Sequence, residues 1–293
     1  MKGKTQGLVV ALVVAVVVAC GPAAADWDPG DPYKMHYPQL PDLQFGLNVL
    51  DGPYVPAAGA APYQKFLADD WTCTESGPVT DIHLWGSWLA DANPFIPKRF
   101  ILGIWSNVPE DASPTGYSMP GQLLWSARWT PQERLYTDSD EGFLDPNQDE
   151  VVGVDSTVFQ YNFIIPTDAA FRQVEGETYW LGATLLMDLD GDDEFTESDL
   201  QIIREQGYAY GWKNSEERYM DTAVWLDIDP YGPYITPGMA AGTDAWQKLT
   251  GPGTTGEDLD LSFVITPEPA TLALVGIGIA GLAACRRRRR LEK

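Results

Sequence analysis

Short runs of aromatic and β-branched residues recur along most of this chain, and Pro and Gly turn signals separate them. Such regularly spaced runs, with almost no helical periodicity, predict an all-β fold, either a β-sandwich or a jelly roll. The only helical pattern covers residues 198–206 and follows an acidic loop, so one short helix is expected there. The predicted strands cover residues 66–73, 79–89, 100–108, 122–130, 157–166, 178–187, 208–212, 223–228 and 259–265.

The segment before these runs differs in composition. Residues 26–63 are rich in Pro, Gly and Ala, which predicts an extended lead-in with at most one strand, around residues 45–50. That strand is expected at a sheet edge or in a linker. The predicted organisation is therefore a lead-in over 26–63 followed by one β-sandwich domain over 64–266.

The first 25 residues have the pattern of a secretory signal. A basic head with Lys2 and Lys4 precedes an apolar stretch over 8–19, and a run of small residues ends at Ala25. The apolar stretch is shorter than the roughly 20 residues that span a bilayer, so signal peptidase is expected to remove residues 1–25. The alternative is that Cys20, which follows a lipobox-like sequence, is lipidated and becomes the mature N-terminus.

The C-terminal segment, residues 267–290, combines three features in order. A Pro-Glu-Pro motif is followed by an apolar run over 270–284 and then by a cluster of arginines, which should stay on the cytoplasmic side. The apolar run is short for a permanent membrane span. The residues of the predicted sorting signal are Pro267, Glu268, Pro269, Arg286, Arg287, Arg288, Arg289 and Arg290.

This tripartite tail closely resembles the PEP-CTERM sorting signal of Gram-negative bacteria. The resemblance implies that an exosortase-like membrane transpeptidase processes the chain near the Pro-Glu-Pro motif. It also implies export to the outer cell surface or the extracellular matrix, with the C-terminal helix as a transient anchor in the cytoplasmic membrane. An ordinary tail anchor is the alternative for the same segment.

The body of the chain also resembles a known family. The segments 69–88, 104–109, 120–125, 176–181 and 211–215 are similar to those of exported, planctomycete-type proteins with PEP-CTERM tails. The resemblance covers roughly residues 64–266. It implies an extracellular domain of unknown function, and it assigns no catalytic residue.

The charge of the chain limits its partners. The chain has 42 Asp and Glu residues against 19 Lys and Arg residues, a formal net charge of -23. So acidic a surface repels nucleic acid phosphates and anionic membranes, which argues against nucleic-acid binding. Cations are the expected small partners, and neutral glycans such as extracellular polysaccharide, or basic surfaces, are the expected large ones.

The strongest motif for a metal site is the acidic loop over 188–199. Its carboxylates have the spacing of an EF-hand-like calcium loop of twelve residues. Two departures keep a solvated acidic loop open as the alternative: Asp193 replaces the usual Gly, and the preceding segment 179–187 is predicted to be a strand. The candidate calcium ligands are Asp188, Asp190, Asp192 and Asp199, the backbone carbonyl of Glu194, and a water molecule near Thr196.

A second acidic run covers residues 138–150. It lacks the spacing of a calcium loop, and no helical pattern follows it. It is therefore predicted to be a solvated loop.

The sequence offers few groups for catalysis. His36 and His83 are the only histidines, and no G-x-S-x-G motif is present. His83 falls inside a predicted strand and is expected to be structural, and Cys73 is expected to be a small buried residue. A pair of carboxylates that hydrolyses glycosides is still possible, but no motif in the sequence shows which two residues would form it. We therefore predict no catalytic residue.

The chain contains 11 tryptophans. Indole faces can stack on sugar rings, but most of these large side chains are expected in the core. Together, these features predict a non-catalytic, calcium-stabilised β-sandwich of the cell surface or extracellular matrix that associates with glycans. The alternatives are a secreted carbohydrate-active hydrolase and a purely structural or adhesive surface protein.

Overall fold

The computed structural model describes residues 26–56, 61–147, 149–192, 194–228, 246–253 and 256–267. The predicted signal peptide lies outside these residues, as do Asp193 and the part of the sorting signal after Pro267, which comprises Glu268, Pro269 and the arginines 286–290. Within the described ranges, no helix is both long and apolar enough to cross a membrane.

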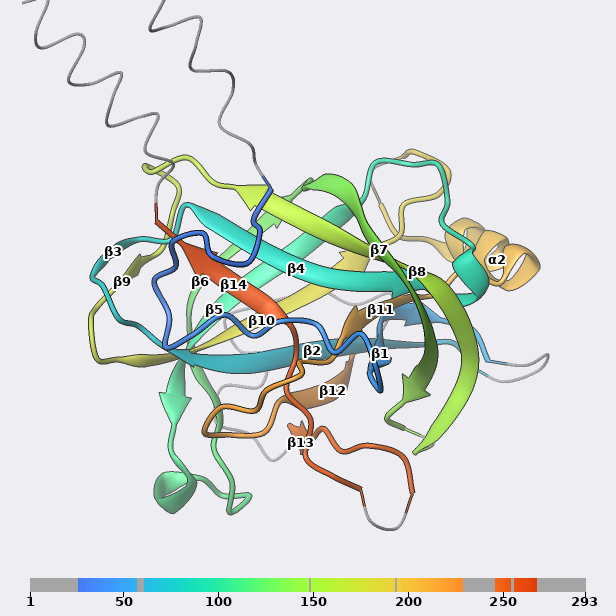
Figure 1. The fold of residues 1–293 in the computed structure, drawn as a ribbon. Coiled ribbons are helices and arrows are strands. Elements are labelled where there is room, and N and C mark those ends of the chain that lie inside the picture. The colour runs from blue at the N-terminus through green and yellow to red at the C-terminus, as the bar shows by residue number, and fades with distance from the viewer. Residues whose placement is uncertain are drawn as a thin grey trace, which may run out of the picture.

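Strands make up most of the described chain, and the prediction of an all-β sandwich with one short helix is confirmed (Figure 1). The helix, α2, covers Glu197–Gln206, and short 3-10 turns cover Leu89–Asp91 and Glu110–Ala112. The strands are β1 (Leu47–Tyr54), β2 (Tyr63–Thr72), β3 (Gly77–Pro78), β4 (Asp81–Trp88), β5 (Arg99–Val108), β6 (Met119–Trp129), β7 (Gln132–Asp145), β8 (Glu150–Ile164), β9 (Arg172–Gln173), β10 (Thr178–Leu186), β11 (Tyr210–Lys213), β12 (Val224–Ile228), β13 (Gln247–Lys248) and β14 (Phe263–Thr266).

Five strands close into a ring through backbone pairing. β1 pairs with β7 in parallel and with β11 in antiparallel orientation. β7 pairs with β8, β8 with β4, and β4 with β11, all antiparallel. The ladder therefore returns to β1, and we call β1, β7, β8, β4 and β11 the five-strand ring. β14 pairs with β4 on the same edge as β11.

A second sheet extends from the far end of β1. Residues 52–54 of β1 pair with β2, and β2 also pairs with β10 and β12. β5 follows β10, and β6 forms the outer edge. The burial patterns agree with these positions: side chains of β10 are buried on both faces, whereas most of β6 alternates between exposed and half-buried side chains.

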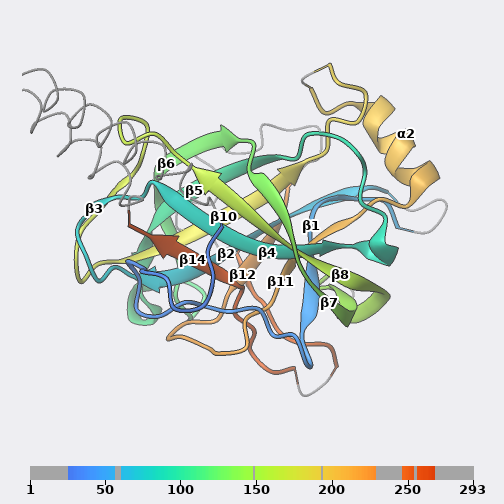
Figure 2. The ribbon, with the colours of Figure 1, turned by 45° about the horizontal axis from the view of Figure 1, so that its top comes forward.

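Aromatic side chains fill the space between the two sheets. Phe100 of the second sheet contacts Tyr161 and Phe163 of β8. Trp71 on β2 contacts Phe263 on β14, with ring centroids 6.2 Å apart. As expected, most tryptophans belong to the core: all are buried except Trp125 and Trp129, which lie half-buried on one face of β6. α2 lies outside the sheets at one end of the molecule (Figure 2).

One expectation about the segment before residue 64 was wrong. The strand near residue 47 is no edge strand, because β1 pairs with β2, β7 and β11. The irregular chain before it is also tied into the fold, since Trp27 and Met35 are buried in the core and Met35 bridges to Cys73. Local composition cannot reveal such isolated long-range bridges.

The acidic run over 138–150 is no solvated loop either. It forms the second half of β7 and the turn into β8. Its side chains alternate between exposed and half-buried positions before the strand becomes buried near Glu141. Acidic residues hide the strand pattern because several of them simply face solvent.

Candidate functional site

The loop between β10 and α2 brings three of the predicted calcium ligands together. Asp188, Asp190 and Asp192 each place a carboxylate oxygen within 4.8 Å of the other two. Asp188 is half-buried, and the other two side chains are exposed. Hard, negatively charged oxygens are the ligands that calcium prefers, and the remaining ligands of such a site are commonly carbonyl groups and water. We call residues 188–199 the aspartate loop.

Backbone hydrogen bonds to these carboxylates curl the aspartate loop. Gly191 donates its N–H to Asp188 Oδ1 over 2.7 Å, and Glu194 donates to Asp192 Oδ1 over 2.9 Å. Such bonds from a residue two or three positions further on form tight Asx-type turns. Gly191 has a φ of 82°, a region that glycine adopts without steric cost. The turns keep the three carboxylates on a short stretch of chain.

Asp199 does not join these carboxylates but bonds to the backbone at the start of α2. It is fully buried in the first turn of α2, and its Oδ1 accepts the N–H of Leu189 over 2.6 Å. Its Oδ2 accepts the N–H of Thr196 over 2.8 Å, and the Thr196 side chain caps the helix in return. The structure therefore places Asp199 and Thr196 in a capping box that fastens the loop to α2, and neither belongs to the group of three carboxylates.

The loop is also anchored to the sheets. Arg99 Nη1 on β5 lies 3.9 Å from Asp188 Oδ2. Phe195 packs against the hydrophobic core. The loop thus links the end of β10 to the start of α2, and it also contacts the first residue of β5.

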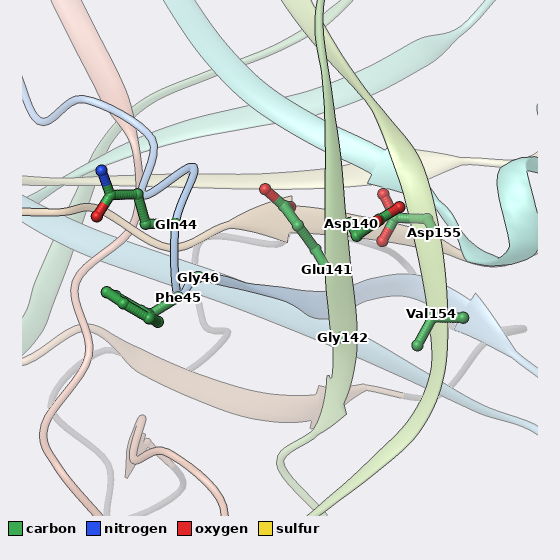
Figure 3. A pocket seen from close by; sticks show the side chains of 8 residues that line it. All are labelled: Gln44, Phe45, Gly46, Asp140, Glu141, Gly142, Val154 and Asp155. Carbon is green, nitrogen blue, oxygen red and sulfur yellow. The ribbon is translucent and has the colours of Figure 1, made fainter.

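A pocket of about 430 Å³ opens beside the five-strand ring and was not predicted from the sequence (Figure 3). Glu141 on β7 and Asp155 on β8 lie directly opposite each other in the ladder, and both side chains are buried. Asn48 on β1 donates its side-chain amide to both carboxylates, over 2.9 Å to Glu141 and 3.0 Å to Asp155. We call this cavity the ring pocket; it is lined by Gln44, Phe45, Gly46, Asp140, Glu141, Gly142, Val154 and Asp155.

The two carboxylates of the ring pocket have different electrostatic environments. Lys213 on β11 places its Nζ 2.7 Å from Glu141 Oε2, and both side chains are almost completely buried. Burial raises the pKa of Asp155 to about 7, and the charge of Glu141 adds to this rise. Glu141 is therefore neutralised by an ion pair, whereas Asp155 takes up a proton near neutral pH.

Comparison with known proteins identifies the domain. Residues 35–266 match the model of a domain of unknown function, DUF7901. The chain belongs to this family. The DUF7901 match begins at Met35 and so includes β1 and the part of the preceding segment from Met35 onward. Residues 266–289 match the PEP-CTERM protein-sorting motif, which confirms the resemblance found in the sequence and indicates an exported, exosortase-sorted protein of the cell surface. Neither the curated proteins nor the solved structures give a match to the chain.

His83 and Cys73 are both buried within the DUF7901 domain, as expected of structural residues. His83 is buried, and its Nδ1 lies 2.7 Å from Asn162 Oδ1. Burial lowers the pKa of His83 to about 4 and raises the pKa of the neighbouring Asp81 to about 7. Both are therefore neutral between these values. Cys73 is a buried free thiol whose pKa is raised by burial, so it is not activated as a nucleophile.

Proposed function

We propose that this DUF7901 protein is a non-catalytic, calcium-stabilised β-sandwich of the outer cell surface or extracellular matrix that associates with polysaccharide. The observation that carries the proposal is the convergence of Asp188, Asp190 and Asp192 in the aspartate loop. Three carboxylates this close repel one another, and a divalent cation removes that repulsion. Calcium is the fitting ion because the ligands are oxygens on a loop that leaves room for carbonyl groups and water.

Calcium at this position would act on stability. The aspartate loop links β10 and α2, and through Arg99 it also contacts β5. An ion bound only in the folded state would therefore hold three elements together and raise the free energy of unfolding. The high net negative charge of the chain increases this stabilisation, because the repulsion between its carboxylates disfavours the compact state until cations bind.

Export and charge support the association with polysaccharide. The sorting motif directs the protein to the cell surface, and its acidic surface favours neutral partners over anionic ones. We propose that signal peptidase removes residues 1–25. An exosortase-like transpeptidase then cuts near Pro267, so that the C-terminal helix anchors the protein only transiently in the cytoplasmic membrane.

A secreted carbohydrate-active hydrolase is the second candidate. The observation that favours it is the neighbouring pair of carboxylates in the ring pocket, because glycosidases use two such groups. Against it, both carboxylates are buried and one is held by Lys213, which leaves little freedom for chemistry.

Electrophoresis in polysaccharide-containing gels distinguishes these functions. The proposed function predicts that neutral polysaccharide retards the protein in a saturable way and that no reducing ends are released. A hydrolase would release reducing ends from the same polysaccharide. A purely structural or adhesive protein would show neither effect, and that result would reject the association with polysaccharide.

A further inference from the structure

We infer that the ring pocket is the site at which this protein binds polysaccharide, and that its ligand is a neutral saccharide unit. This inference rests on the proposed association with polysaccharide and adds the place and the chemistry of recognition. Four features of the pocket carry it: its polar floor, its unpaired hydrogen-bonding atoms, its charge balance and its apolar rim.

The polar floor of the pocket is formed by Glu141 and Asp155, which line the cavity, and buried polar side chains of the other ring strands lie behind them. Each strand contributes one buried polar residue, so the floor is fixed by backbone pairing on every side. Such a rigid arrangement suits a binding site, because the side chains lose little conformational entropy when the ligand binds. Glu141 on β7 and Asp155 on β8 line the cavity. Asn48 on β1 and Lys213 on β11 contact these carboxylates from behind, and Ser87 on β4 is the buried polar residue of the fifth strand.

Several atoms in and behind this floor have unused hydrogen-bonding capacity. Asn48 Oδ1, Glu141 Oε1 and Asp155 Oδ2 are buried and have no hydrogen-bond partner among the described residues. Buried polar groups are nearly always paired in native proteins, with protein, water or ligand. All three atoms can accept a hydrogen bond, and Asp155 can also donate one when it is protonated. Sugar hydroxyl groups both donate and accept hydrogen bonds, so they can pair with these atoms in either state of Asp155.

The charges at the pocket favour a neutral ligand. A cation is disfavoured because the Lys213 ammonium group already lies 2.7 Å from Glu141. An anion is disfavoured by Glu141 and by Asp140, which also lines the cavity. A polyol that donates hydrogen bonds to the carboxylates and carries no charge avoids both penalties.

The rim offers an apolar surface beside this polar floor. Phe45 is 87% exposed and Val154 is 67% exposed, and both line the cavity. Glu141 extends from β7 toward the segment that carries Gln44 and Phe45 (Figure 3). A sugar ring has an apolar face of C–H groups and a polar edge of hydroxyl groups, so it can contact the Phe45 ring and the carboxylates together. The volume of about 430 Å³ suits a small ligand.

The test compares two exposed phenylalanines. Phe45→Ala removes the apolar rim of the pocket, and Phe95→Ala is the matched control, because Phe95 is fully exposed and does not line the cavity. Both side chains are exposed, so neither variant should unfold the protein. Asp155→Asn is a third variant that keeps the shape of the side chain and replaces one of its two oxygens with an amide NH2 group, which cannot accept a hydrogen bond.

Dissociation constants are measured by gel retardation in dextran, hydroxyethylcellulose and galactomannan. We expect Phe45→Ala and Asp155→Asn to weaken retention by about tenfold, equivalent to about 1.4 kcal/mol, and Phe95→Ala to bind like the unmodified protein. If the protein is retained and all three variants match it, polysaccharide binds elsewhere: the inference fails and the proposed function stands. If the unmodified protein is not retained by any of these neutral polysaccharides, the proposed association fails and the inference fails with it.

Discussion

Removing charge from the aspartate loop should abolish a calcium-dependent rise in thermal stability. The change is the double replacement Asp190→Asn, Asp192→Asn. An Asn side chain still offers a carbonyl oxygen to the backbone N–H groups of Asp192 and Glu194, which now bond to the two carboxylates. The loop should therefore keep its turns while losing two of the three converging negative charges.

The size of the effect follows from linkage. Extracellular calcium modules bind with dissociation constants of about 10⁻⁴ to 10⁻³ M. At about 10 mM calcium, the free ion is at about 10 to 100 times Kd, which stabilises the folded state by about 1.4 to 2.7 kcal/mol. A domain of this size gains about 2 to 4 °C per kcal/mol, so the melting temperature should rise by about 3 to 11 °C.

Tryptophan fluorescence during heating measures this shift, with calcium compared against a chelator. The control is Asp138→Asn, Asp140→Asn, which removes the same charge from β7. Magnesium should have a smaller effect than calcium, because it demands stricter geometry and dehydrates reluctantly. A full calcium shift in the aspartate-loop variant, or an equal loss in the control, would show that the ion acts through general charge screening and not through this loop.

Three further predictions concern other parts of the chain. Lys213→Met should lower the free energy of unfolding in urea by about 3 to 5 kcal/mol, because it leaves Glu141 buried without its partner; an unchanged urea midpoint would contradict this. The pKa of Asp81 is raised to about 7 in the folded state, so the folded state binds this proton more tightly than the unfolded state, and stability is lost as pH rises from about 4 to 7. Asp81→Asn should lose less stability across that window, as measured by denaturation at pH 5 and pH 7.5, and equal slopes would refute the assignment. Mass spectrometry of the cell-surface fraction should find a chain that lacks residues 1–25 and ends near Pro267, whereas recovery of the full-length chain alone would contradict processing.

Local sequence patterns predicted most of the strands because those strands are buried. β5 and β10 consist largely of apolar residues on both faces, and such runs are visible without knowledge of their partners. β7 was missed for the opposite reason. One part of β7 faces solvent, and Glu141 belongs to the polar floor of the ring pocket. The strand therefore has the polar composition that is typical of a loop.

The aspartate loop shows what the spacing of residues in the sequence can and cannot predict. The spacing correctly placed Asp188, Asp190 and Asp192 close together. It could not reveal that both oxygens of Asp199 are taken by backbone N–H groups, because the capping box depends on how α2 starts. Sequence spacing identifies candidate ligands, but hydrogen bonding in the folded chain decides which carboxylates remain available to bind an ion.

The ring pocket was beyond the reach of sequence analysis. Its floor is held from behind by residues as distant as Asn48 and Lys213, which meet only because β1 pairs with β11. The sole sequence signal was the surplus of carboxylates, in which one pair cannot be distinguished from another. Only closure of the five-strand ring singles out Glu141 and Asp155.

A crystal structure of the protein grown in about 10 mM calcium, a concentration that should saturate an extracellular site, would show directly whether the aspartate loop holds calcium. We predict a bound cation coordinated by oxygens of Asp188, Asp190 and Asp192 at about 2.3 to 2.6 Å, with Asp199 still bonded to the backbone of the loop. A loop that holds only water at this calcium concentration, with the three carboxylates turned apart, would show that it is not a calcium site.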